Sequence, residues 1–141
     1  MIVVDASVAV KWLTGEQDRE AANQLLANGE PIVGPALLRT EVAAALARKA
    51  RFGDITADDA TAALELWLTM LHRADLDLTI EHPDLARALA LSLELSHPLQ
   101  DCVYLALAER LDAPLVTADE KFAAKARRRH PLIRTLAGFR Q

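Results

Sequence analysis

The chain opens with Ile2-Val3-Val4-Asp5, three β-prone apolar residues that run directly into one acid. A short run that is apolar on both faces is typical of a central strand covered by helices on both sides. In such sheets the functional groups lie beyond the carboxyl ends of the strands. Residues 6–13 have the pattern of a helix, so Asp5 lies at a strand-to-helix turn. Its carboxylate there either caps the helix or takes part in chemistry.

Strand and helix patterns alternate along the rest of the chain. Strands are predicted at 31–35, 76–80, 115–117 and 132–136, and helices at 16–28, 36–52, 56–73, 84–95 and 101–111, with a basic helix after residue 119. This alternation predicts an α/β fold of three α/β/α layers, in which helices flank a central, mostly parallel sheet. Because no repeat or linker interrupts the pattern, we expect one domain over residues 1–141.

Composition and charge narrow the class of protein. Hydrophobic residues make up 52% of the 141 residues and charged residues 26%, as in globular proteins. No apolar run approaches the roughly 18 residues of a membrane span, and the N-terminus lacks signal-peptide order, so we expect a cytoplasmic protein without a membrane partner. Cys102, the only cysteine, cannot form an internal disulfide and is expected in the core.

The net charge of −4 disfavours a protein that coats nucleic acid, yet the charge is uneven. From Glu120 to the end there are seven basic residues and one acid. This asymmetry would let a polyanion approach one side of the molecule, and a solvated helix end explains it equally well.

Three acids besides Asp5 stand out by position. Glu41 falls inside the apolar stripe of helix 36–52, where an unpaired carboxylate costs several kcal/mol, so it needs a cation, hydrogen-bond partners or an ion pair with Arg48. Asp101 lies in the first turn of a buried helix, where the helix dipole would also stabilise it. Asp119 follows strand 115–117, which in a parallel sheet ends at the same edge as Asp5.

We therefore expect the four carboxylates to converge. Crowded carboxylates repel one another, and a hard divalent cation such as Mg²⁺ or Mn²⁺ relieves that repulsion through oxygen ligands. Zinc is disfavoured because no ligand spacing links the four histidines, at 72, 82, 97 and 130. Two such cations would activate a water for phosphodiester hydrolysis without a covalent protein nucleophile.

The segments that carry these acids together resemble a known family. Residues 2–10, 38–42, 101–108 and 115–122 are similar, in order and spacing, to the PIN-domain ribonucleases, especially the VapC toxins of bacterial toxin–antitoxin pairs. The resemblance implies a PIN-like fold and metal-dependent endoribonuclease activity. It implies that the catalytic, Mg²⁺- or Mn²⁺-binding residues are Asp5, Glu41, Asp101 and Asp119, supported through hydrogen bonds by Ser7 and Thr117.

The resemblance also implies partners. An RNA substrate, a cognate antitoxin and a second copy in a homodimer are expected. Candidates for contacts to RNA phosphates, which position a substrate without reading its sequence, are Lys11, Arg39, Lys121 and Arg128.

Two other functions remain open. A receiver-like module would use Asp5 in an acidic cluster that binds Mg²⁺ and a phosphoryl group, but it leaves Glu41 unexplained and needs an acceptor Asp after a middle strand, which residues 76–80 do not supply. A non-catalytic interaction module is the other possibility, if the acids do not converge.

Overall fold

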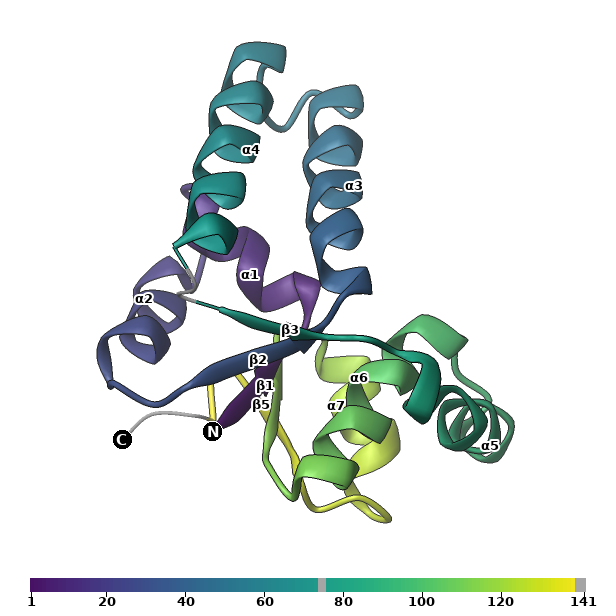
Figure 1. The fold of residues 1–141 in the computed structure, drawn as a ribbon. Coiled ribbons are helices and arrows are strands. Elements are labelled where there is room, and N and C mark those ends of the chain that lie inside the picture. Colours follow the sequence, from purple (N-terminus) through teal and green to yellow (C-terminus); the bar gives the residue numbers. More distant parts are fainter. Residues whose placement is uncertain (74–75, 139–141) are drawn as a thin grey trace.

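Five parallel strands form the centre of the molecule in a computed structural model, which describes residues 1–73 and 76–138 (Figure 1). Their order across the sheet is β3-β2-β1-β4-β5. The strands are β1 (Ile2–Val4), β2 (Ile32–Pro35), β3 (Asp77–Thr79), β4 (Leu115–Thr117) and β5 (Ile133–Thr135). The opening strand therefore lies in the middle, paired in parallel with β2 and β4.

Helices cover both faces of this sheet, as predicted (Figure 1). One face carries α1 (Ala6–Leu13), α2 (Arg19–Ala27), α3 (Leu37–Arg51) and α4 (Ala57–His72). The other carries α5 (Leu85–Leu95), α6 (Leu99–Leu111) and α7 (Glu120–Arg127), and a short 3₁₀ turn, η1 (His82–Asp84), precedes α5.

The chain reverses its direction across the sheet after β3. It first steps outward from β1 to β2 and β3, and then returns to place β4 on the other side of β1. Because parallel crossovers are right-handed, this reversal moves the later helices to the opposite face. A crevice forms beyond the carboxyl ends of the strands where the order reverses, between β1 and β4. The observed order also differs from the 2-1-3-4-5 order of receiver-like folds, so the receiver alternative is wrong.

Helix α6 forms the buried centre of the second helical layer. Its residues from Cys102 to Ala108 are all buried, which confirms the expectation from its uniformly apolar sequence and places the cysteine in the core. The helix packs against β1 and β2. Of the helices in the described part of the chain, none has the length and hydropathy needed to cross a membrane.

Two predicted helix boundaries are wrong. Helix α2 begins at Arg19 rather than Glu16, because Asp18 adopts a left-handed conformation with φ of 67° that a continuous helix cannot accommodate. Helix α6 begins at Leu99, directly after Pro98, rather than at Asp101. A proline is compatible with this position because the first backbone N–H groups of a helix have no intrahelical acceptor.

Candidate active site

The two strand-end acids occupy the crevice between β1 and β4. Parallel pairing of these strands aligns Val4 with Val116, so the residues that follow each strand emerge at the same edge. Asp5 is only 5% exposed, and its Oδ1 accepts hydrogen bonds from Ser7 Oγ at 2.5 Å and from the Val8 N–H at 3.3 Å. Asp5 therefore caps α1 and also faces the crevice, so the two roles considered from the sequence coexist.

Asp119 repeats this arrangement on β4. Its Oδ1 accepts a hydrogen bond from the Phe122 N–H at 3.0 Å and caps α7. Ser7 and Thr117 join the two strand ends: their hydroxyl oxygens lie 3.3 Å apart, and each accepts a backbone N–H from the turn after β4. These hydroxyls thus fix the carboxylates relative to each other.

The two helix-borne acids have one side-chain partner each. Glu41 on α3 accepts a 2.5 Å hydrogen bond from the Tyr104 hydroxyl, and it forms no ion pair with Arg48 among the described residues. Asp101 on α6 has its Oδ2 2.6 Å from His97 Nε2, and its side chain does not cap the helix. The ion pair considered for Glu41 therefore does not account for its position, whereas Asp101 lies in the first turn of α6, where the helix dipole also stabilises its charge.

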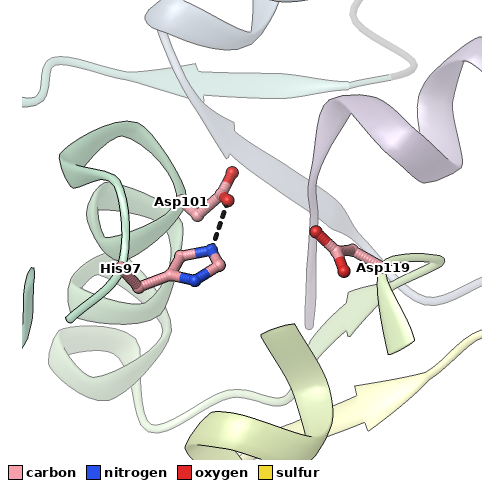
Figure 2. Close-up of side chains that lie close together, drawn as sticks. All are labelled: His97, Asp101 and Asp119. Atoms are coloured by element: carbon pink, nitrogen blue, oxygen red, sulfur yellow. Dashed lines mark hydrogen bonds and ion pairs between the residues drawn. The ribbon is translucent and has the colours of Figure 1, made fainter. Parts of the chain in front are cut away.

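All four acids line one cavity of about 520 Å³. Its other polar and charged lining residues are Ser7, Lys11, Glu16, Arg48, Lys49 and Tyr104. The tightest potential ligand group consists of His97, Asp101 and Asp119, whose ligand atoms lie within 4.8 Å of one another (Figure 2). Asp5 and Glu41 reach the same cavity outside this tightest group.

Burial disfavours negative charge on two of the acids, Asp5 and Glu41. Burial raises the pKa of Asp5 to about 6; hydrogen bonds from Ser7 and Thr117 oppose the shift, and the Asp101 charge adds to it. Burial also raises the pKa of Glu41, against the opposing Tyr104 hydrogen bond and with a further contribution from Asp101. Because a bound cation would reverse these penalties, the donor set suits a hard divalent ion.

The predicted phosphate-binding residues do not share one location. Lys11 lines the cavity and contacts Glu16 at 3.6 Å, and Lys49 forms a second ion pair with the same glutamate. In contrast, the described lining does not include the other three candidates, which are exposed: Arg39, Lys121 and Arg128. Lys49 was missed because it lies about two turns along α3 beyond the segment 38–42 that carries the motif.

Two partners of the acids also escaped the sequence analysis. His97 precedes Asp101 by four residues but lies before the start of α6, so its contact with Asp101 depends on the break between α5 and α6. Tyr104 lies one turn after Asp101 on α6, and its partner Glu41 is 63 residues away in the chain. Spacing between histidines does not reveal His97, because its partner is an acid.

Comparisons with known proteins agree with this geometry. Residues 2–128 match the family model described as PIN domain. The chain is 31% identical over 124 residues to a Mycobacterium tuberculosis protein named Ribonuclease VapC1. The aligned residues cover 86% of this chain and 88% of that protein. A solved toxin–antitoxin complex from Klebsiella pneumoniae is similar in structure, with 19% sequence identity and a TM-score of 0.70 over 96% of this chain and 98% of that chain. The structure of Mycobacterium tuberculosis VapC20, described as a Sarcin-Ricin loop cleaving toxin, is also similar, with 19% identity and a TM-score of 0.67 over 88% of this chain and 94% of that chain. At that identity the structures show a shared fold.

Proposed function

This chain belongs to the PIN-domain family, and from that membership we propose that it is a VapC-type ribonuclease, the toxin of a toxin–antitoxin pair. It hydrolyses RNA phosphodiester bonds with Mg²⁺ or Mn²⁺ as cofactor. The observation that carries the proposal is the convergence of carboxylates from four separate chain segments on one cavity. Similarity to Ribonuclease VapC1 over most of both chains supports the same activity.

The residues that would hold the cation are Asp5, Glu41, Asp101 and Asp119. Each has one carboxylate oxygen anchored by a donor from the protein. A carboxylate has two oxygens, so each anchored acid has one left to offer a cation. When bound there, the ion would supply Lewis-acid chemistry, activating water and stabilising charge on phosphoryl oxygens.

The chain's own residues keep this site in shape and receive the substrate. Ser7 and Thr117 hold the ends of β1 and β4 in register, and Tyr104 fixes Glu41. Lys11 lines the wall of the cavity, which supports a contact between its ammonium group and an RNA phosphate beside the acids. Contacts of the exposed Arg39, Lys121 and Arg128 with RNA would lie outside the cavity.

The partners belong to the same proposal. The chain acts in the cytoplasm as one domain over residues 1–141, binds a cognate antitoxin and forms a homodimer. The similarity in fold to a chain in a toxin–antitoxin complex supports the antitoxin. Exposed leucines on α4 and α5 supply apolar surface for such contacts: Leu66, Leu68, Leu89 and Leu93.

Cleavage of a structured RNA by the purified protein tests the activity. We expect cleavage with Mg²⁺ or Mn²⁺ and none in EDTA. Asp101→Asn should lower the cleavage rate by more than about 100-fold, because loss of a residue that only hydrogen-bonds to a metal ligand already costs 10- to 100-fold. Asp54→Asn, at an exposed turn far along the chain from the motif, is the matched control. Undiminished cleavage in EDTA would reject the metal mechanism.

Growth of bacteria tests the toxin role separately. Expression of the wild-type chain without an antitoxin should arrest growth, and Asp5→Asn or Asp101→Asn should relieve the arrest while Asp54→Asn does not. Equal toxicity of all four proteins at matched levels would remove the nuclease from the explanation.

A further inference from the structure

His97 lies at the break between α5 and α6 with its backbone fixed on both sides. Ser96, in a left-handed conformation with φ of 50°, ends α5. The His97 N–H donates to the Ser92 carbonyl at 3.1 Å, and the Ser92 hydroxyl donates to the His97 carbonyl at 2.5 Å. These two bonds set the point from which the imidazole side chain projects.

The imidazole ring is fixed as well. It stacks on the buried ring of Phe122, with 4.4 Å between ring centroids and 19° between ring planes. The side chain of His97 is only 11% exposed. Its orientation is therefore set by packing, independently of any bound ion.

This fixed ring contacts one oxygen of Asp101. His97 Nε2 lies 2.6 Å from Asp101 Oδ2, and because an ionised carboxylate only accepts hydrogen bonds, the nitrogen donates (Figure 2). Asp101 lines the cavity, whereas His97 is not among the described residues that do. The ring thus holds the carboxylate from outside the cavity, and the second Asp101 oxygen points away from the ring (Figure 2).

The same aromatic residue connects both acids of the tightest group. Phe122 stacks on His97 through its ring and donates its backbone N–H to Asp119 Oδ1 at 3.0 Å. The spacing between Asp101 and Asp119 is therefore set through His97 and Phe122. Without this support the Asp101 side chain, which is 34% exposed, would be free to change rotamer.

We propose that His97 is a positioning residue of the metal centre: it holds Asp101 Oδ2 so that the other oxygen is presented to the cation. This inference rests on the proposed function. Hydrogen-bond partners of metal-binding carboxylates orient the ligand and typically change metal affinity by 10- to 100-fold. His97 acts through Asp101 and does not itself bind the ion.

The test measures Mn²⁺ binding to the full-length protein, independently of activity. His97→Gln keeps a donor near the Nε2 position. His97→Met has nearly the shape of the glutamine variant but no donor, and His97→Phe keeps the aromatic stack without a donor. Dissociation constants come from the electron paramagnetic resonance of free Mn²⁺, and thermal midpoints are measured in EDTA.

We expect Mn²⁺ to bind about 10- to 100-fold more weakly to the Met and Phe variants than to wild type, and within about threefold of wild type to the Gln variant. The midpoint of the Phe variant in EDTA should match wild type; if this variant fails to fold, the Gln and Met pair decides. Equal affinity of Gln and Met variants would overturn the proposal. So would a directly bound nitrogen in the electron spin echo of the wild-type Mn²⁺ complex, which would make His97 a ligand. Failure of wild type to bind Mn²⁺ at all would instead refute the proposed function, and this inference with it.

Discussion

Asp5 and Asp84 are equally deep in the protein but are balanced in different ways. Asp84, in η1, is 2% exposed and accepts two hydrogen bonds from the Arg110 guanidinium, at 2.7 and 3.0 Å. Asp5, at 5% exposed, is held only by neutral donors from Ser7, Val8 and Thr117. Within residues 1–73 and 76–138 the fold thus supplies a cation to Asp84 and none to Asp5. The acid that burial leaves unbalanced is the one that marks a site for a cation from outside.

Removing the internal cation should produce the largest change in stability. Arg110→Gln leaves the charge of Asp84 buried without compensation, which we expect to lower the free energy of unfolding by about 3 kcal/mol. RNA cleavage per folded molecule should not change. Urea unfolding measures the loss, with Arg87→Gln as control because Arg87 pairs with Glu109 at the surface and contributes at most about 1 kcal/mol. Equal losses for both variants would mean that the buried Asp84 gains nothing from its pair with Arg110, whose side chain is partly exposed.

The raised pKa of Asp5 should make the metal-free protein less stable as the pH rises. The pKa of Asp5 is about 6 in the folded protein and 3.8 in the reference state, so between these values the folded state binds more protons than the unfolded chain. Stability in EDTA should therefore fall as the pH rises from about 4 to above 6, by up to roughly 3 kcal/mol from this residue. The stability of Asp5→Asn should not show this fall with pH, because the asparagine side chain does not titrate. A difference between the two proteins that stays constant from pH 5 to pH 7.5 would contradict the unbalanced charge.

A smaller effect is expected at the basic wall of the same cavity. Glu16 pairs with both Lys11 and Lys49, so its carboxylate would compete with any substrate phosphate for these two ammonium groups. Glu16→Gln should lower the dissociation constant for RNA about two- to fivefold, the range of an exposed ion pair, and should steepen the salt dependence of binding. Fluorescence anisotropy with a labelled RNA at several salt concentrations measures both quantities. Weaker binding by this variant would show that the glutamate orients the lysines for RNA instead of competing with it.

Much of the fold follows from local patterns in the sequence. The apolar run before Asp5, the stripe around Glu41 and the uniformly apolar α6 each depend on neighbouring residues, so periodicity predicts the strand, the helix face and the buried helix. The parallel sheet then brings Asp5 and Asp119 to one edge.

The partners of the acids depend instead on packing between distant segments. Tyr104 reaches Glu41 across 63 residues, and Arg110 reaches Asp84 across 26. The resemblance selected Lys11, which lines the cavity, but it also selected Arg39, which is exposed elsewhere on α3, and it missed Lys49, which lines the cavity. Which face a charge occupies is decided by how α3 docks, and spacing along the chain does not specify that.

Thermal unfolding of wild type and Asp101→Asn, each in EDTA and in Mn²⁺, tests most directly whether the converging acids hold a cation. Because the ion binds the folded site and not the dispersed acids, free Mn²⁺ at a hundredfold excess over its dissociation constant should stabilise wild type by about 2.7 kcal/mol. The variant should respond less, since one ligand is gone, while the two proteins should be of similar stability in EDTA. If Mn²⁺ shifts neither midpoint, the metal centre proposed for this cavity is wrong; if it shifts both equally, Asp101 is not a ligand and the four acids do not act together.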